Sequence, residues 1–453
     1  MAPDVASISK CDCVYQLSYY LLLRLGQSGG ALMILYFCIE VRPLTIILFT
    51  AMMYAIVCST DVFSKWNWGN AVEKLKEKYE RRWPGQVKLL TYPTLCERSD
   101  SDPTCPILSC LPRLSELRPC YCCFVAHYSD CDKQFIREVN KLTRQLDPSH
   151  PYTDAVWGIL TGLTQEDILF AIKQESLVIR RVVGNCPVDL EKFYSGIWFS
   201  EFEQCVSYRK DPSKTTAETI QSSTRVSVVK ERCAPDPTFL IASEISSRRC
   251  PESNQGVDMI ISSAHATERD WNIGYAFRSG KFLCREGQLY GLSLEGERMD
   301  VQQTGCAKIL SAAGNCLMGY ICDKDCMALA WMHSANVVQM VGYIEPTWYG
   351  YGGWGVHNYF INNPGSMSFA SAFFANQQSL LHLLHSKYSC HVEASLGEHR
   401  EVYHRCFNSD LTAKEGLSRE CSGLLYDRDN VAFYGDPAWE AALAEDKELY
   451  HYT

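Results

Sequence analysis

Apolar and polar positions alternate along most of the chain in the pattern of an α/β protein. Residues 54–58 form an unbroken apolar run, which predicts a buried strand. Residues 67–83 repeat apolar side chains at helical spacing, with Val72, Leu75 and Tyr79 on one face. Pro84-Gly85 ends this helix, and residues 87–92 read as a second strand. A strand, a helix and a strand in this order predict a βαβ unit and a parallel sheet.

The same alternation continues toward the C-terminus. Further strands are predicted at 121–126, 155–160, 257–263, 307–313 and 337–344, and helices at 133–146, 165–174, 325–334 and 367–384. Asp325 is expected to cap the helix that it begins. The polar stretch 97–119 reads as a loop, and the Ser-, Thr- and Lys-rich stretch 209–223 reads as a surface excursion.

A chain of 453 residues exceeds the usual size of one hydrophobic core, so two subdomains are expected. The predicted division is an apolar segment at 1–52, an N-terminal α/β subdomain at 53–224, a second α/β subdomain at 225–440 and a tail at 441–453. The expected fold is a mostly parallel sheet flanked by helices.

The N-terminal segment is strongly apolar at 17–25 and again at 31–58. Charged residues and a proline interrupt the second stretch, and the unbroken run 44–57 is shorter than the about 20 residues that a spanning helix needs. Residues 17–57 therefore read as a membrane anchor, a signal-like segment or elements packed on the domain. We favour membrane association or secretion over a cytoplasmic location.

Composition excludes some classes of function. A hydrophobic share of 47% and a charged share of 21% are those of a globular protein. A net charge of -9 without long Lys/Arg runs argues against nucleic-acid binding. The odd count of 23 cysteines suits a free thiol beside disulfides, or no disulfides at all. The cysteines between Cys96 and Cys131 lack the spacing of a zinc ribbon, although Cys120 and Cys123 alone fit one knuckle. A redox or metal protein built on this cluster is a remaining alternative.

Two predicted strands lead into residues with catalytic chemistry. The strand at 257–263 is followed by His265, and the strand at 307–313 by Cys316. Ligands of open parallel sheets bind beyond the carboxyl ends of strands, where an imidazole can activate a thiol as nucleophile. The two positions are 51 residues apart, close to the roughly 50 typical of caspases. With 11 histidines and 23 cysteines such a pair also arises by chance, and an inert buried cysteine is the alternative.

Short motifs surround this pair in a fixed order. Residues 260–266 read Ile-Ile-Ser-Ser-Ala-His-Ala, and residues 312–320 read Ala-Ala-Gly-Asn-Cys-Leu-Met-Gly-Tyr. They are followed by 328–333, 338–343, Pro346-Thr347-Trp348 and Phe433-Tyr434-Gly435-Asp436-Pro437, and preceded by the Asp-containing segment 151–158. In this order, over roughly 54–439, the chain resembles the gingipain-type cysteine peptidases, which are grouped with caspases, legumain and separase.

The resemblance implies a caspase-like sandwich and a cysteine endopeptidase that acts on a protein or peptide substrate without a cofactor or metal. His265 would be the base and Cys316 the nucleophile, with a backbone N–H near Ala266 in the oxyanion site. Trp348 would lie beside the substrate pocket. Asp154 would orient the histidine or line that pocket, and a turn-capping role is its alternative. Glu268 and Asp270 are further candidates for orienting the histidine.

Two positions depart from the family pattern. Ala266 stands where a glycine usually follows the histidine, and Asn315 stands where alanine is commoner. Both changes leave a second interpretation open. In that interpretation the chain is a catalytically inert module of the same fold that is used for interaction and held at a membrane.

Two competing motifs are weaker. Residues 350–355 satisfy the dinucleotide pattern G-x-G-x-x-G, but no acidic residue follows before Glu393 to bind the ribose. Its aromatic side chains suit the wall of a peptide cleft or a packed turn instead. His382 and His385 lie three apart on an apolar helix without a further ligand at helical spacing, so they read as helix-face residues.

Overall fold

The computed structural model describes residues 52–93, 106–211, 228–249, 256–389 and 418–445. The expected apolar segment lies almost wholly outside these ranges, as does most of the expected excursion at 209–223. No helix in the described ranges is both long and apolar enough to cross a bilayer.

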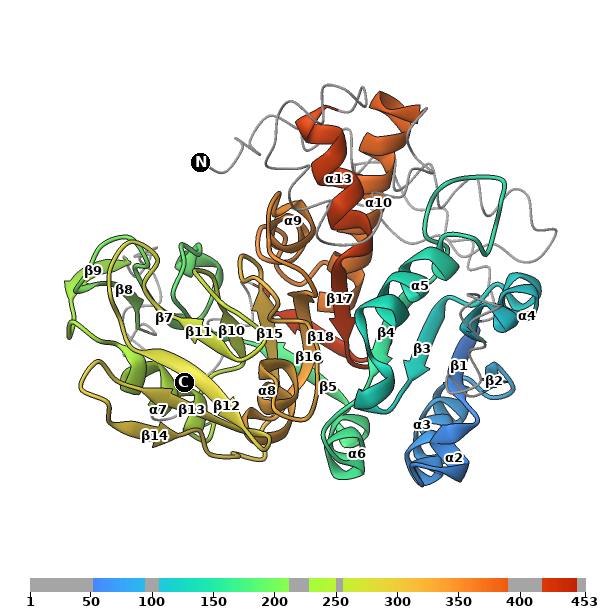
Figure 1. Ribbon diagram of the computed structural model, residues 1–453, viewed down its shortest axis with the longest axis horizontal. Helices are drawn as coiled ribbons and strands as arrows, with labels where there is room; N and C mark the ends of the chain where they lie inside the picture. Colours follow the sequence, from blue (N-terminus) through green and yellow to red (C-terminus); the bar gives the residue numbers. More distant parts are fainter. Residues whose placement is uncertain (1–51, 94–105, 212–227, 250–255, 390–417, 446–453) are drawn as a thin grey trace, which may run out of the picture.

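A twelve-stranded mixed sheet runs through the molecule (Figure 1). Across the sheet the strands are β2 (Val87–Tyr92), β1 (Tyr54–Ser59), β3 (Tyr121–Val125), β4 (Val156–Leu160), β17 (Val431–Tyr434), β16 (Val337–Tyr343), β15 (Lys308–Ala312), β10 (Met259–Ile261), β6 (Arg181–Gly184), β7 (Ser195–Phe199), β8 (Val206–Lys210) and β9 (Val229–Arg232). Neighbours are parallel from β2 to β17 and again from β16 to β7. The antiparallel pair β17–β16 joins these two halves, so their strands run in opposite directions.

Two smaller sheets complete the strands. A four-stranded antiparallel sheet contains β11 (Asp270–Asn272), β12 (Lys281–Arg285), β13 (Gln288–Leu292) and β14 (Arg298–Asp300). A parallel pair is formed by β5 (Ser176–Ile179) and β18 (Glu440–Leu443), so residues expected at the start of a tail belong to a sheet.

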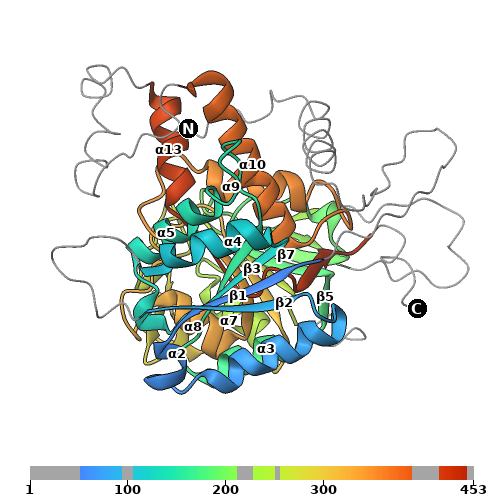
Figure 2. The same cartoon turned by 90° about the vertical axis from the view of Figure 1, so that its right-hand side faces the viewer.

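Helices cover both faces of the large sheet, as the two views agree (Figures 1 and 2). One layer contains η3 (Pro106–Cys110), α4 (Leu111–Leu117), α5 (Lys133–Thr143), α9 (Tyr351–Phe360), α10 (Phe369–Lys387) and α13 (Arg419–Asp429). The other contains α2 (Asp61–Ser64), α3 (Gly69–Arg82), α6 (Gln165–Lys173), α7 (Thr238–Ser246) and α8 (Met327–Ala335). Two short turns are η4 (Tyr128–Asp130) and η5 (Leu190–Lys192). The fold is therefore α/β, with a large, mostly parallel mixed sheet flanked by helices.

The strands and helices predicted from continuous apolar runs and helical spacing are confirmed. β1 and β2 pair in parallel, with Tyr54 opposite Val87. The helix between them buries Val72, Leu75 and Tyr79. Because helices cover both faces, the strands are apolar on both sides, and this is why they read as unbroken runs.

Three local predictions are wrong. The stretch 97–119 was expected to be a loop, but residues 106–117 form η3 and α4. The glycine-rich stretch 350–355 was expected to be a loop or turn, but it forms the first turns of α9, because its glycines let the helix approach β15. Asp325 does not cap α8. The N-cap is Cys326, and the Asp325 carboxylate instead accepts the backbone N–H of Glu286.

Strand pairing divides the chain earlier than composition indicated. Residues 181–210 were expected in an N-terminal subdomain that ends at 224, but β6, β7 and β8 pair within the half that contains β10 and β15. The strand order β2-β1-β3-β4 in one half matches the order β7-β6-β10-β15 in the other. In both halves, the strand that comes second along the chain lies on the outer side of the strand that comes first. This repetition has no fixed period in the sequence.

The motif Gly435-Asp436-Pro437 follows β17 and fixes it against its neighbours on both sides. Gly435 has φ 115°, and a Cβ there would lie 2.3 Å from the carbonyl oxygen of Val338, so the position requires glycine. The buried Asp436 carboxylate accepts hydrogen bonds from the hydroxyls of Tyr54 (2.9 Å) and Tyr79 (2.5 Å), and Lys78 lies 3.6 Å away. Asp436 therefore connects the end of β17 to β1 and α3.

Replacing this carboxylate should destabilise the fold strongly. Asp436→Ala leaves two buried tyrosine hydroxyls and Lys78 without their acceptor, so we expect the free energy of unfolding to fall by about 3 kcal/mol. Urea denaturation measures this value. As a control, Glu440→Ala breaks only the exposed pair with Arg82 and should cost less than about 1 kcal/mol. Equal losses in the two variants would contradict this role for Asp436.

Candidate active site

His265 and Cys316 follow neighbouring strands of the second half of the sheet. β10 and β15 pair in parallel, with Ile261 opposite Ser311. Because the strands are parallel neighbours, the two loops that follow them leave the sheet at the same edge. His265 is exposed and Cys316 is partly buried. The two predicted residues therefore lie on adjacent loops, as the expected chemistry requires.

The side chain of Asn315 ties these two loops together. Its amide nitrogen donates to the carbonyl oxygens of Ser263 (2.7 Å) and Ala264 (3.0 Å), the residues just before His265. Its amide oxygen accepts from the Ser262 hydroxyl at 2.5 Å. Asn315 is completely buried. The residue before the candidate nucleophile thus holds the backbone before the candidate base.

The backbone is strained beside both candidates. Ala264 has φ 71° and Leu317 has φ 57°, in the left-handed region that residues with a Cβ rarely adopt. One of these positions directly precedes His265 and the other directly follows Cys316. Such strain persists only where surrounding contacts impose it, and it clusters at functional sites.

The imidazole of His265 stacks on Tyr275, with ring centroids 4.5 Å apart and planes inclined by 20°. Tyr275 in turn contacts Phe202, and both aromatic rings are more than half exposed. The backbone N–H of Asn272 donates to the His265 carbonyl oxygen at 2.8 Å, and Ala266 forms a bridge with Trp271. The histidine therefore stands at the base of a tight hairpin, with one ring face covered.

Cys316 is held from the other side by the loop after β16. The backbone N–H of Thr347 donates to its Sγ at 3.2 Å, and the Thr347 hydroxyl donates to the Asn315 carbonyl oxygen at 2.8 Å. Burial raises the pKa of the Cys316 thiol above its usual 9.0, and the Thr347 contacts lower it in part. No hydrogen bond joins His265 to Cys316 in this described region. The Cys316 thiol is thus a weaker acid than usual and makes no hydrogen bond to the candidate base.

Trp348 lies one residue beyond the Thr347 contact with Cys316. Its indole packs edge-on against Tyr426 of α13 at 6.2 Å, and the Arg419 guanidinium lies 6.0 Å from the ring. The loop that carries Trp348 continues into α9, where a Cβ on Gly353 would come within 2.2 Å of the Ala313 carbonyl oxygen. The predicted pocket residue is therefore placed on the loop that contacts the thiol.

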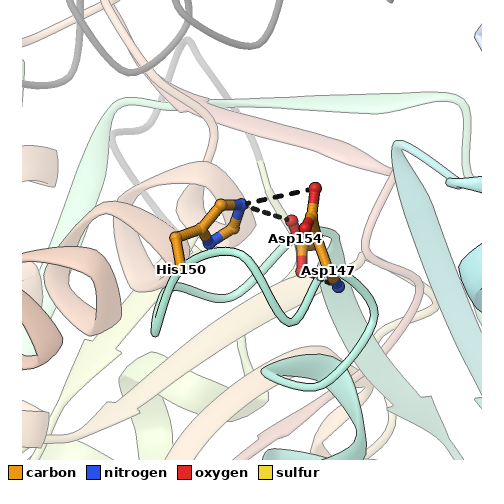
Figure 3. A group of neighbouring side chains, drawn as sticks. All are labelled: Asp147, His150 and Asp154. Carbon is orange, nitrogen blue, oxygen red and sulfur yellow. Dashed lines mark hydrogen bonds and ion pairs between the residues drawn. The ribbon is translucent and has the colours of Figure 1, made fainter. Parts of the chain in front are cut away.

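Asp154 belongs to a different part of the same sheet. It precedes β4, which is separated from β10 by three intervening strands, or roughly 19 Å at the usual spacing between strands. Its buried carboxylate lies 3.3 Å from His150 Nε2 and accepts the backbone N–H of Asp147 at 2.9 Å (Figure 3). These contacts fit the turn-capping role, which is the alternative interpretation of Asp154. In the described residues they are made with its own loop and not with His265.

The other two acidic candidates do not orient the histidine either. Asp270 accepts from the Thr267 hydroxyl at 2.8 Å, and its second oxygen lies 3.6 Å from Lys281. The backbone carbonyl of Glu268 accepts the N–H of Met327 at the start of α8. Both residues support the hairpin and its contact with α8.

Asp147, His150 and Asp154 form the group of possible metal ligands in the described ranges, with ligand atoms within 4.8 Å of one another (Figure 3). The backbone N–H of Tyr152 donates to His150 Nδ1 at 3.3 Å. A ring nitrogen that accepts carries no proton, so the proton of the imidazole is on Nε2 and faces the two carboxylates. The arrangement is that of a neutral imidazole whose Nε2–H faces the two carboxylates, whereas a metal ligand needs the Nε2 lone pair.

The cysteine cluster contributes no metal group in the part of the chain that the structure describes. Its cysteines there are free thiols, and Cys122 and Cys123 are buried in β3. Cys96 and Cys105 lie outside the described residues.

His382, expected on a helix face, contacts the Tyr152 hydroxyl through Nδ1 at 3.0 Å.

Sequence reasoning missed Glu201, a buried carboxyl beside the candidate pair. Its backbone carbonyl accepts the N–H groups of Tyr275 (2.8 Å) and Ala276 (3.0 Å), and so supports the ring that stacks on His265. Its Oε2 is buried without a hydrogen-bond partner among the described residues. Burial raises the pKa of Glu201 from 4.5 to about 7, and a hydrogen bond with the Ser263 side chain opposes this rise. A single glutamate in a strand-end loop carries no pattern that could have revealed it.

No protein-family model matches this chain, and no curated protein matches it.

The raised pKa of Glu201 predicts a pH dependence of stability. Folding disfavours the charged carboxylate, so Glu201 stabilises the fold below its unfolded pKa of 4.5 and loses this contribution as the pH rises through about 7. Glu201→Gln has no proton to lose. We therefore expect its free energy of unfolding, measured by denaturant titration from pH 4.5 to 7.5, to fall less with pH than that of the wild type. A difference between the two proteins that is the same at every pH would contradict this assignment.

Proposed function

We propose that this protein is a cysteine endopeptidase with a caspase-like sandwich fold, in which His265 and Cys316 form the catalytic pair. The observation that carries the proposal is the parallel pairing of β10 with β15, which sends the two residues from one edge of the sheet on adjacent loops. The buried side chain of Asn315 and the strained residues beside each candidate support it. The motif order that resembles gingipain-type peptidases supports it independently.

The chemistry follows from the two side chains. The imidazole of His265 takes the proton of the Cys316 thiol, and the thiolate attacks the carbonyl carbon of a peptide bond. The imidazolium then donates its proton to the leaving amine, and an acyl group remains on Sγ. Water, activated by the same imidazole, hydrolyses this thioester and restores the thiol. No metal or cofactor enters these steps.

The resting site is not yet in its reactive arrangement. Burial holds the pKa of Cys316 above its usual value, and His265, stacked on Tyr275, makes no hydrogen bond to the thiol in the described residues. Catalytic hydrogen bonds are often long or absent before substrate binds. We propose that a bound peptide brings the imidazole to the sulfur.

The raised pKa also favours a second candidate, an inert module of this fold that binds a partner without cleaving it. A thiol that stays protonated is a poor nucleophile. Membrane association or secretion remains a proposal that rests on the apolar residues 17–57, most of which lie outside the described ranges.

A peptide with an electrophilic acyloxymethyl ketone separates these two functions. We expect it to label Cys316 of the wild type, to label His265→Ala at least about 100-fold more slowly, and not to label Cys316→Ala. A panel with basic, acidic and apolar residues at the reactive end covers the unknown cleavage preference. Intact-mass spectrometry measures the labelling.

Cys306→Ala is the matched control, because Cys306 is a free, partly buried thiol in the loop before β15. It should be labelled like the wild type. Equal labelling rates in wild type, His265→Ala and Cys316→Ala would end the peptidase proposal, and labelling at Cys316 that does not depend on His265 would favour the inert module.

The stack between Tyr275 and His265 gives a further prediction. Removing the ring in Tyr275→Ala frees the imidazole, so we expect the rate of probe labelling to fall by about tenfold. Tyr275→Phe keeps the stacked ring and should stay within about twofold of the wild type. If the two variants behave alike, stacking does not position the histidine.

A further inference from the structure

We infer that Asn315 is a positioning residue that sets the His265 loop relative to Cys316. The inference rests on the proposed peptidase function and adds a third residue to the pair. The sequence marked this position only as a departure from the family pattern, where alanine is commoner.

The contacts of Asn315 leave little freedom between the two loops. Its side-chain nitrogen bonds two successive carbonyl oxygens, of Ser263 and Ala264, and its side-chain oxygen bonds the Ser262 hydroxyl. Three residues in a row before His265 are thus held by one side chain. Its own backbone carbonyl receives the Thr347 hydroxyl, and the Thr347 N–H reaches the Sγ of Cys316. A single buried residue therefore connects the base, the nucleophile and the loop beside them.

Three side chains donate hydrogen bonds to the carbonyl oxygen of Ser263. It accepts from Asn315 Nδ2 at 2.7 Å, from Trp271 Nε1 at 2.7 Å and from Asn185 Nδ2 at 3.1 Å. Trp271 and Asn185 come from the hairpin after His265 and from the end of β6, which are parts of the His265 side of the site. Asn315 alone among these three donors comes from the loop that carries Cys316.

The strain at Ala264 explains why such a support is needed. A residue with a Cβ at φ 71° relaxes unless its surroundings hold it, and Asn315 bonds the carbonyl oxygen of Ala264 itself. If that bond is lost, the backbone before His265 can return to a common conformation and move the imidazole. Displacements of about 1 Å in a catalytic group cost up to about 100-fold in rate.

The test compares Asn315→Ala with Asn140→Ala. Asn140 is also buried and also makes three side-chain hydrogen bonds, but it lies on α5 and bonds residues of α5, β17 and α10 instead of the two candidate loops. On a peptide substrate that the wild type cleaves through Cys316, we expect Asn315→Ala to lose about 10- to 100-fold in kcat with KM within about threefold. Asn140→Ala should keep the wild-type kcat at temperatures where it is folded.

Two further measurements separate positioning from folding. The pH profile of Cys316 labelling by the peptidyl acyloxymethyl ketone, which fills the peptide site, should lose its imidazole-dependent acidic limb in Asn315→Ala and keep it in Asn140→Ala. Asn315→Asp preserves the size and shape of the side chain but removes both N–H donors, so its kcat should fall as in the alanine variant. If Asn315→Asp behaves like the wild type, the donors do not position His265.

The outcomes also distinguish the two proposals. A wild type without Cys316-dependent cleavage overturns both the peptidase function and this inference. Cleavage by the wild type together with an Asn315→Ala variant whose kcat and pH profile match those of Asn140→Ala overturns the inference alone. If circular dichroism shows that Asn315→Ala is unfolded, Asn315→Ser replaces it, and the same fall in kcat is expected.

Discussion

The parallel pairing of β10 with β15 is the constraint on which the candidate site depends. Parallel neighbours place their carboxyl ends together, so the register of Ile261 with Ser311 decides that the two following loops meet. Neither loop could hold its conformation alone, because each contains a residue with a Cβ in the left-handed region. The Asn315 side chain bonds the Ala264 carbonyl oxygen across the sheet edge, and the Leu317 N–H donates to the Glu345 carbonyl oxygen after β16. The candidate site therefore requires both strands, and neither motif forms it alone.

The two halves of the sheet run in opposite directions, and this determines which strand ends share an edge. Since β17 runs against β16, the amino ends of the first-half strands lie at the same edge as the carboxyl ends of the second-half strands. The loop that carries Asp154 therefore shares an edge with His265, although the strands between them keep the two apart. At the junction of the halves, Gly435 packs against Val338 of β16 where a Cβ has no room, and the Gln339 side chain of β16 donates to the Asp436 carbonyl oxygen.

Sequence patterns could predict the elements that depend on local burial and could not predict what depends on strand order. Apolar runs located β1, β3, β4, β10, β15 and β16, because covered strands are largely apolar on both faces. The short strands between residues 176 and 232 were not predicted, since each has only four or five residues and several of them are partly exposed. His265 and Cys316 were predicted because strand ends mark them, and the pairing of β10 with β15 places them on adjacent loops. Asp154 was misplaced and Glu201 missed because their distances from His265 follow from the order of strands across the sheet, which the chain order does not reveal.

The burial of Cys316 has a consequence for the chemical lifetime of the protein. Peroxides oxidise the thiolate far faster than the thiol, and the first product can proceed to irreversible acids. A thiol whose pKa is held above 9.0 remains in its resistant form at neutral pH. Sensitivity to oxidants would then begin only when a bound peptide draws the proton to His265. In the proposed peptidase, the same burial that delays nucleophilic attack protects the sulfur while the site is empty.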